Sequence, residues 1–532
     1  MRDRRTEVGA GTESKIRGIE QEYPVSAKAG LNPSLLVNAA IQGLKRRRFS
    51  RDVNWDIATE VSQEAHESRI ASSYGENGCR IYNDMGHLEI STPSYNNPFD
   101  AVAYDKASEI YAFMGSREAS LALKKKVVIH KNNVANFFSR AGAGSGIHIG
   151  KGKKVKTNTY ATHGNIITKR EACEDWSRVE KALIPWIVTR ILFAGSGDVV
   201  SGETIGKEGV KFVISPRAMF VVQKSSLSTT VGRGILNTRD QPHAARKYWR
   251  LHDIHYEALR SEYAIFLRDI AQAMVICAFE SGFLDDAPEI EDPVRAFKKI
   301  SADTQECEWK IKLKNGESTD AVSILRFYLE GIEKMYEEMG KEEGKWAEIG
   351  RRGLKEVIEK LEARRVEEYV DGIDWVTKLA LLVNYEPKNA AEGISISNQY
   401  ALVDESALYG IQDGKDSLKG SSCLYNPKES RAFAKRALPE VDWRALSDRV
   451  KYALTNAPEQ TRDFFKVEML RRYGSHVRSV SWSTMVLDEA KIMLDEPFML
   501  NKEEIGTQMV EGKQIEDVLS AAKELYPDKV TF

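Results

Sequence analysis

Two glutamates, Glu20 and Glu22, stand two residues apart in a segment, 15–25, where apolar and acidic residues nearly alternate. Such alternation predicts a β-strand, and both carboxylates then project from the same face of it. Paired carboxylate oxygens suit a hard cation such as Mg²⁺, which takes its remaining ligands from water and nucleotide phosphates. A solvated strand face is the commoner explanation for an isolated pair of this spacing, so that alternative stays open at this point.

A second polar cluster follows further along the chain. Arg80, Tyr82 and Asp84 alternate along one predicted strand and therefore share a face. A Met-Gly turn comes next, and the returning strand carries Glu89. A hairpin of this form brings Asp84 and Glu89 toward Glu20. A polar edge of a sheet explains this cluster equally well when it is considered alone.

Arginine and histidine side chains provide the remaining candidates. Arg239 and His243 stand in the segment ILNTRDQPH, where the guanidinium suits a phosphate and a neutral imidazole suits a metal or a hydrogen bond. His163, in YATHGN, stands at the start of a predicted strand and has the same two interpretations. Buried histidines are more often structural, so this alternative stays open for both.

The overall composition excludes several classes of protein. The 77 basic and 78 acidic residues give a net charge of −1, so we expect neither nucleic acid nor a membrane as partner. No apolar run is long enough to cross a bilayer and no signal-peptide pattern begins the chain, which favours a cytoplasmic protein. Five scattered cysteines without a CxxC pair predict neither a zinc site nor disulfides. The GxSxG, HExxH and strand-linked GxGxxG motifs are absent from the sequence.

Apolar periodicity predicts a mixture of strands and helices. The predicted strands cover residues 79–84, 88–91, 126–132 and 165–168. Helices are predicted over 33–45 with Asn32 as N-cap, over 98–112, and within 248–281, 323–384 and 428–454. Segment 133–159, with its AGAGSGIHIGKGKKVK run, lacks amphipathic periodicity and is predicted to be a long, mobile loop. Its glycines and lysines do not have the spacing of a P-loop.

Several segments together resemble the family of Pup ligases and depupylases. These are GIEQEY, RIYNDMGHLEISTPSYNNPFDAVAYDKASE, IHKNNV, YATHGN, FAGSG and ILNTRDQPHAARKYWRLH. The resemblance runs from Gly18 to Asp286, resumes at 372–382, and returns in the stretch that ends at Trp482. It implies an α+β fold like that of glutamine synthetase, in which a curved, mainly antiparallel sheet cradles magnesium and nucleotide, helices back the sheet, and a small C-terminal domain closes one end.

The resemblance also implies a division of the chain and a set of site residues. The expected parts are a flexible extension (1–17), a catalytic domain (18–427), a small C-terminal domain (428–500) and a tail (501–532). Asp84 would be the catalytic carboxylate, Mg²⁺ and ATP or ADP the cofactors, and a Pup-like modifier with its lysine conjugates the partner. The implied magnesium ligands are Glu20, Glu22, Tyr82, Glu89 and His243, and the implied ATP-binding residues are Arg80, Thr92, Arg239 and Trp482.

Three segments are more similar to depupylases than to ligases: VNWDIATE (53–60), the turn 84–89, and the stretch from APEQTRDFF to RRYGSHV. They imply a nucleotide- and magnesium-dependent hydrolase that cleaves the isopeptide bond to a substrate lysine, or deamidates the modifier's C-terminal Gln. An ATP-dependent Pup–protein ligase is the alternative. A catalytically reduced binding protein is a further one, supported only by Gly164, which stands where the family usually has Glu. Ile90 also departs from the family, in which an aromatic residue usually follows Glu89.

Overall fold

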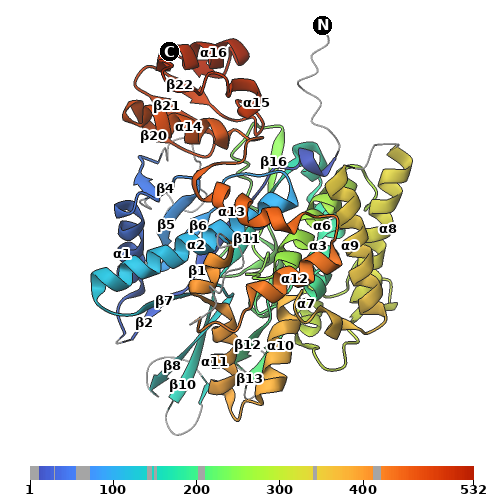
Figure 1. The fold of residues 1–532 in the computed structure, drawn as a ribbon. Helices are drawn as coiled ribbons and strands as arrows, with labels where there is room; N and C mark the ends of the chain where they lie inside the picture. The colour runs from blue at the N-terminus through green and yellow to red at the C-terminus, as the bar shows by residue number, and fades with distance from the viewer. Residues whose placement is uncertain are drawn as a thin grey trace.

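A sheet of nine strands forms the centre of the molecule (Figure 1). The computed structural model describes residues 11–28, 30–55, 72–140, 147–148, 153–201, 210–339, 344–410 and 421–532. The strand order is β14-β15-β16-β11-β1-β6-β5-β4-β3, and every neighbouring pair is antiparallel except β14 with β15. The strands are β1 (Arg17–Tyr23), β3 (Ser50–Asp52), β4 (Ser72–Gly75), β5 (Arg80–Asp84), β6 (His87–Ser91), β11 (Thr162–Lys169), β14 (Gln223–Ser226), β15 (Gly234–Asn237) and β16 (Tyr248–Asp253). The mainly antiparallel sheet and the helices around it confirm the predicted α+β class.

Two long helices, α2 (Pro98–Leu123) and α6 (Glu262–Glu280), pack against each other beneath the sheet. Nearly every residue of α6 is buried, because further helices cover its other side. The remaining helices of the large unit are α1 (Pro33–Arg46), α3 (Trp176–Thr189), α4 (Ile191–Ala194), α7 (Pro293–Ala302), α8 (Ala321–Met339), α9 (Lys345–Glu362), α10 (Asp374–Tyr385), α11 (Ala390–Ala401), α12 (Pro427–Ala437) and α13 (Leu446–Thr455). Within the described part of the chain, no helix combines the length and hydropathy that a membrane span requires.

The chain ends in a smaller unit, drawn in red in Figure 1. Its sheet has the order β20 (Val477–Val480), β21 (Thr484–Leu487), β22 (Lys491–Met493), β23 (Val530–Thr531), and α14 (Asp463–Tyr473), α15 (Lys502–Ile505) and α16 (Ile515–Leu525) accompany it. Phe433 and Trp443 pack into the core of the large unit, whereas Val518 and Val530 pack into the small one. The division into domains stays a prediction.

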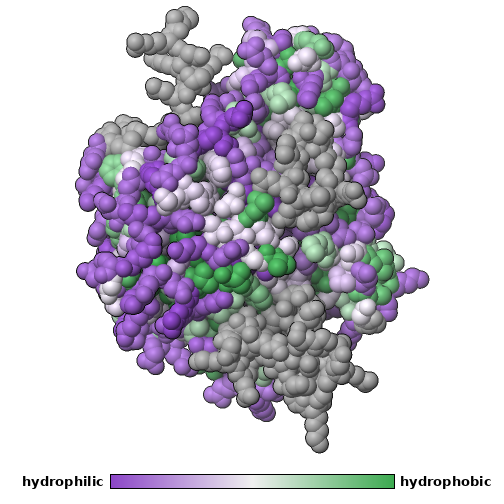
Figure 2. Space-filling model, turned by 180° about the vertical axis from the view of Figure 1, so that it is seen from behind, coloured by the Kyte–Doolittle hydropathy of each residue, from purple (hydrophilic) through white to green (hydrophobic). Residues whose placement is uncertain are grey.

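Figure 2 shows the opposite face of the molecule, where hydrophilic side chains cover most of the described surface. Residues 1–10 of the expected flexible extension lie outside the described residues. The described end of that segment is packed: Lys15 Nζ lies 2.5 Å from a carboxylate oxygen of Glu280, and both side chains are buried. The guanidinium of Arg17 likewise binds the buried carboxylate of Asp269 on α6, with Nε 3.0 Å from Oδ2.

Two predictions of secondary structure were wrong. Residues 134–140 and 153–159 are not irregular but form the paired antiparallel strands β8 (Val134–Arg140) and β10 (Lys153–Thr159), with β9 (Ile147–His148) beside β10. The glycines between them concealed the β-branched residues of the two arms. Residues 248–253 are the strand β16 rather than the start of a helix, because they pair with β11.

Three short ladders complete the strand structure. β2 (Val25–Ala27) and β19 (Leu402–Val403) pair with β7 (Val127–His130) on its two sides. The other two ladders join β12 (Asp198–Ser201) to β13 (Val210–Val213) and β17 (Lys310–Lys312) to β18 (Ser318–Asp320). The predicted helix start at Asn32 is confirmed, because its side chain accepts a hydrogen bond from Ser34 N at 2.8 Å.

Strand β1 separates a polar face from an apolar one, as its sequence predicts. Ile19, Gln21 and Tyr23 are buried on the side of the helices, and Glu20 and Glu22 are half-buried on the other side. Gly164 of β11 pairs with Ile19 and lies on the helix side, where a Cβ atom would come within 2.6–2.7 Å of three ring carbons of Tyr256. A glutamate at position 164 therefore could not join Glu20 and Glu22 on the polar face.

This close approach predicts that Gly164→Ala destabilises the protein by about 1–3 kcal/mol, the usual cost of overpacking a core. Gly18→Ala is the matched control, since Gly18 is on the neighbouring strand and its nearest atom, Thr92 Oγ1, would be 3.8 Å from the new Cβ. The midpoint of thermal unfolding should fall for the first variant and change little for the second. Equal midpoints would show that the sheet can move away from Tyr256.

Candidate active site

Three carboxylates converge on the polar face of the sheet. Glu22, Asp84 and Glu89 each offer an oxygen, and these oxygens all lie within 4.8 Å of one another. Strand register brings them together, because Glu89 of β6 pairs with Glu22 on one side and with Tyr82 on the other. The β5–β6 hairpin closes through Met85 and Gly86, whose φ angles of 48° and 96° are those of the tight turn that antiparallel strands favour.

The cluster concentrates negative charge in a buried place. Burial and the negative charges of Asp84 and Glu22 raise the pKa of Glu89 well above its usual value. Tyr82 donates a hydrogen bond to Glu89 Oε1. Burial also opposes ionisation of Glu22. The hydrogen bond and charge of His87, together with smaller contributions from His163 and Arg217, outweigh burial and lower the pKa of Glu22 to about 2.

A second group of donors adjoins the first along β1. Glu20 Oε2 lies 2.9 Å from His163 Nδ1, and Glu20 Oε1 accepts a hydrogen bond from Asn165 Nδ2 at 2.9 Å. Donor atoms of Glu20, His163 and His252 lie within 4.8 Å of one another. Burial opposes ionisation of Glu20, yet the hydrogen bond from His163 and the neighbouring cations lower its pKa well below the usual value.

The donor chemistry of these groups fits a bound cation. Three carboxylates at this separation repel one another unless a cation or protons neutralise them, and such oxygens are the ligands that Mg²⁺ prefers. In the second group, the buried Nε2 of His252 has no hydrogen-bond partner among the described residues. Imidazole nitrogens widen the range of metals that this group accepts. The structure places His243, a predicted metal ligand, in neither group of donor atoms.

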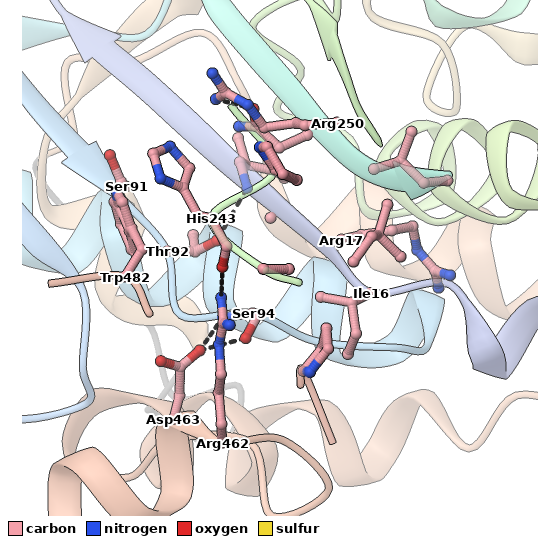
Figure 3. A pocket seen from close by; sticks show the side chains of 18 of the residues that line it. Ile16, Arg17, Ser91, Thr92, Ser94, His243, Arg250, Arg462, Asp463 and Trp482 are labelled. Carbon is pink, nitrogen blue, oxygen red and sulfur yellow. Dashed lines mark hydrogen bonds between the residues drawn. The ribbon is translucent and has the colours of Figure 1, made fainter. Parts of the chain in front are cut away.

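A pocket lies between the sheet and the small unit, beside Glu20 (Figure 3). Its apolar wall includes Ile16, Ile166 and Trp482, and its cations come from both units of the chain: Arg250 from β16, and Arg462 and Lys466 from the start of α14. An apolar wall for a base beside cations for phosphates is the composition that a nucleotide requires. The residues present therefore fit ATP or ADP.

Four predicted residues line this pocket: Glu20, Thr92, His243 and Trp482. Thr92 Oγ1 accepts a hydrogen bond from Ile19 N at 3.0 Å. The ring of Trp482 lies 6.2 Å from that of His243, whose carbonyl oxygen accepts a 2.7 Å hydrogen bond from Arg462 (Figure 3). Burial, followed by the charge of Arg250, lowers the pKa of His243 well below its usual value, so this imidazole is neutral.

The two predicted arginines lie outside the lining of the pocket. The Arg80 guanidinium is held between aromatic rings, with its Cζ 4.4 Å from the centre of the Trp55 ring and 4.5 Å from that of Tyr82. Arg239 is buried behind the second donor group, where its positive charge helps to lower the pKa of His252. Both arginines thus border the site without being part of the pocket wall.

Sequence reasoning named His163 of β11 as a candidate but missed Asn165 on the same strand and Arg250 and His252 on β16. His163 and Asn165 alternate as Glu20 and Glu22 do, so their spacing alone could have placed them on the polar face. Arg250 and His252 have the same spacing. The helix predicted for this stretch hid their shared face, because on a helix residues two apart point in different directions.

The sequence is similar to those of several known proteins. A family profile described as "Pup-ligase protein" matches residues 15–486. A depupylase of Acidothermus cellulolyticus is 29% identical to this chain, and the match covers 89% of the chain and 91% of the depupylase. A Pup deamidase/depupylase of Mycolicibacterium smegmatis is 28% identical, with coverages of 89% and 91%. A Pup–protein ligase of Acidimicrobium ferrooxidans is also 28% identical, with coverages of 92% and 97%.

Solved structures share the fold. The structure of the complex between Pup and its ligase PafA is similar with a TM-score of 0.71 at 20% identity, and the match covers 98% of this chain and 94% of that chain. PafA in complex with ADP has a TM-score of 0.64 at 21% identity, with coverages of 86% and 90%. Since the family profile spans most of its length, this chain belongs to the Pup-ligase family.

Proposed function

We propose that this protein is a nucleotide- and magnesium-dependent amide hydrolase that acts on a Pup-like modifier. It would release the modifier from substrate lysines, deamidate the modifier's C-terminal Gln, or do both. The convergence of Asp84 with Glu22 and Glu89 is the observation that carries this proposal. Relatives named depupylase or Pup deamidase/depupylase, and solved structures of PafA with Pup and with ADP, support it.

The donor groups suggest which residues would hold the cofactors. Glu22 and Glu89 would bind Mg²⁺, with Tyr82 fixing the orientation of Glu89 through its hydrogen bond. Glu20 would bind a cation together with His163. Thr92 and Trp482 would contact ATP in the pocket, with Arg80 and Arg239 beside it, whereas His243 is better placed to line the pocket than to bind a metal. A bound cation would act as a Lewis acid that stabilises negative charge on the reacting carbonyl oxygen.

Asp84 would perform the chemistry, because it stands at the end of β5 and is only half-buried. Its carboxylate would either attack the amide carbonyl or orient and deprotonate a water molecule. Arg239 would add positive charge near the second donor group, because its charge also helps to lower the pKa of His252. Leaving ammonia or the lysine amine would take up a proton from the group that served as base.

The alternatives differ in what supports them. Gly164 faces Tyr256 rather than the carboxylates, so it gives no support to a catalytically reduced binding protein. An ATP-dependent ligase remains the alternative, in which Asp84 would deprotonate an incoming lysine, and the fold shared with PafA supports it. The depupylase-like segments 53–60 and 84–89 favour the hydrolase.

Asp84→Asn should reduce turnover on the order of a hundredfold or more, because the amide keeps the shape of the carboxylate but is neither base nor nucleophile. Amide hydrolysis is followed by mass spectrometry with Mg²⁺, ATP and a modifier ending in Gln. Asp448→Asn, an exposed carboxylate on α13, is the control and should leave turnover unchanged. Near-normal turnover by Asp84→Asn would remove Asp84 from the mechanism.

The direction of the reaction is tested by following modifier and nucleotide together. Purified protein is incubated with Mg²⁺, ATP and the modifier, supplied both as a lysine conjugate and with a free C-terminal Gln. We expect released or deamidated modifier without a matching amount of ADP, since a hydrolase does not need to consume the nucleotide. New conjugates formed in step with ADP would establish the ligase instead.

Magnesium should stabilise the protein by relieving repulsion among the carboxylates. At about 100 times its Kd a ligand contributes about 2.7 kcal/mol, which for a chain of this size raises the midpoint of thermal unfolding by roughly 1–3 °C. A raised pKa keeps Glu89 protonated in the folded state where the unfolded state is ionised, so without Mg²⁺ stability falls as the pH rises toward that pKa. The gain from Mg²⁺ should therefore grow with pH.

Glu89→Gln should reduce the gain in the midpoint from adding Mg²⁺, because it removes one of the three carboxylates, and it should lessen the fall of the Mg²⁺-free midpoint as the pH rises toward the pKa of Glu89. Glu489→Gln, in the exposed group of His476, Asp488 and Glu489, is the matched control and should leave the gain unchanged. An undiminished gain in Glu89→Gln would mean that Mg²⁺ binds elsewhere.

A further inference from the structure

The wall of the pocket proposed for the nucleotide includes a residue from near the end of the chain. Pro497 lines this pocket together with residues 242–244, a loop of the large unit. Its carbonyl oxygen accepts a 3.0 Å hydrogen bond from Arg462 N. The family profile ends at residue 486, so Pro497 lies beyond the matched region. The segment 494–498 thus adds a contribution of the small unit to the pocket.

Backbone and guanidinium contacts join this segment to the loop 242–248. Ala245 N donates a hydrogen bond to Asp495 O at 2.8 Å. The guanidinium of Arg462 donates to two carbonyl oxygens, that of His243 at 2.7 Å and that of Leu494 (Figure 3). The loop and the segment are therefore linked directly beside the pocket, because His243 and Arg462 both belong to its lining.

Glu496 provides the charged contact between the segment and the loop. Its Oε1 lies 2.8 Å from Lys247 Nζ, and its Oε2 accepts a 3.0 Å hydrogen bond from Tyr248 OH. Burial and the charge of Glu496 raise the pKa of Tyr248 above its usual value, so the hydroxyl remains a donor. One carboxylate of the small unit thus binds two side chains at the point where the loop enters β16.

The ring of Tyr248 connects this contact to the apolar wall of the pocket. Tyr248 packs in a buried cluster with Ile16 and Ile167, and Phe498 packs against the same cluster. Ile16 and Ile167 both line the pocket. A displacement of Tyr248 would therefore also move the apolar wall that the base of a nucleotide would contact.

The loop needs such support, because its backbone is strained. His243 has a φ angle of 48°, a left-handed conformation that costs energy for any residue except glycine. Pro242 and Ala244, its neighbours, line the pocket with it. Strained conformations persist only where surrounding contacts hold them. Glu496 supplies such contacts at the far end of the loop.

We propose that Glu496 is a positioning residue for the nucleotide. It fixes Lys247 and Tyr248, and through them the loop 242–248, so that the pocket has its binding shape before the nucleotide enters. This inference rests on the proposed function, in which the pocket holds ATP or ADP. Because binding and positioning are coupled, bound nucleotide should in turn strengthen the contact between the two units.

Glu496→Ala removes both contacts and should raise the Kd and the KM for Mg²⁺-ATP on the order of tenfold, the effect of losing a hydrogen bond to a charged group. The kcat at saturating ATP and the KM for the modifier should stay unchanged, because Glu496 is not part of the pocket wall. Glu496→Gln keeps an acceptor for Tyr248 and should give a smaller loss. Tyr248→Phe keeps the ring and should also weaken ATP binding, so it tests the proposal if Glu496→Ala fails to fold. Kd is measured by isothermal titration calorimetry, and hydrolysis by mass.

Glu459→Ala is the matched control. Glu459 Oε1 accepts a 2.9 Å hydrogen bond from Tyr452 OH and lies 2.8 Å from Lys502 Nζ, so it also joins the two units. Its side chain is 29% exposed, against 30% for that of Glu496. Glu459 is outside the pocket wall, so the affinity for ATP should stay unchanged even if the midpoint of thermal unfolding falls equally in both variants.

The outcomes separate positioning from general loosening of the units. Unchanged ATP affinity in both Glu496→Ala and Tyr248→Phe, an equal loss in Glu459→Ala, or a lower kcat at unchanged KM would overturn the positioning role. Weaker ATP binding by Glu496→Ala, in a protein that hydrolyses neither the lysine conjugate nor the C-terminal Gln, would support this role while contradicting the proposed hydrolase. A wild type without affinity for ATP would overturn both.

Discussion

The mutual repulsion of three carboxylates is the constraint on which this structure depends. With oxygens no more than 4.8 Å apart, each ionised pair costs about 3–4 kcal/mol at an effective dielectric constant of about 20. Strand register holds Glu22, Asp84 and Glu89 together, and the register is fixed from the other face of the sheet, where the fully buried Ile81 and Leu88 pack into the large core. The apolar face thus holds in place a polar face that would otherwise spread apart.

The two-residue period of the strands also decides which sequence differences affect the site. Gly164 and Ile90 depart from the family's usual residues, and both lie on the face that packs against helices. Gly164 makes room for the ring of Tyr256, and Ile90 is fully buried in the large core. These differences therefore change how the sheet packs on its helices, and the carboxylates, imidazoles and amide of the polar face are unaffected.

Local pattern predicted the parts of the fold that short stretches of sequence determine. Alternation identified β1, the Met85–Gly86 turn identified the hairpin, and Asn32 marked the start of α1. Strand β16 was missed because its partner β11 is distant in sequence, whereas β8 and β10 were missed because the Gly-rich stretch between them concealed the β-branched residues of the two arms. Missing β16 also hid Arg250 and His252. For the site, the sequence pattern showed which side chains share a face of the sheet. Only the pairing of the strands shows that Glu20 lies beside His163 and Glu22 beside Glu89.

Strand β1 carries Glu20 beside the pocket proposed for the nucleotide and Glu22 in the carboxylate cluster, an arrangement that suits a ligase and a hydrolase equally. Similar identity to both kinds of relative, 28% and 29%, is what such a site would produce. Apart from the turn 84–89, the features proposed to distinguish the two activities lie outside the carboxylate cluster. One depupylase-like segment contacts the small unit near Arg80: Trp55 stacks on the Arg80 guanidinium, packs edge-on against Trp482 at 5.3 Å, and bridges to Val480. Segment 53–55 and the C-terminal unit therefore pack together beside the pocket proposed for the nucleotide. A change from consuming the nucleotide to only binding it would originate at this contact.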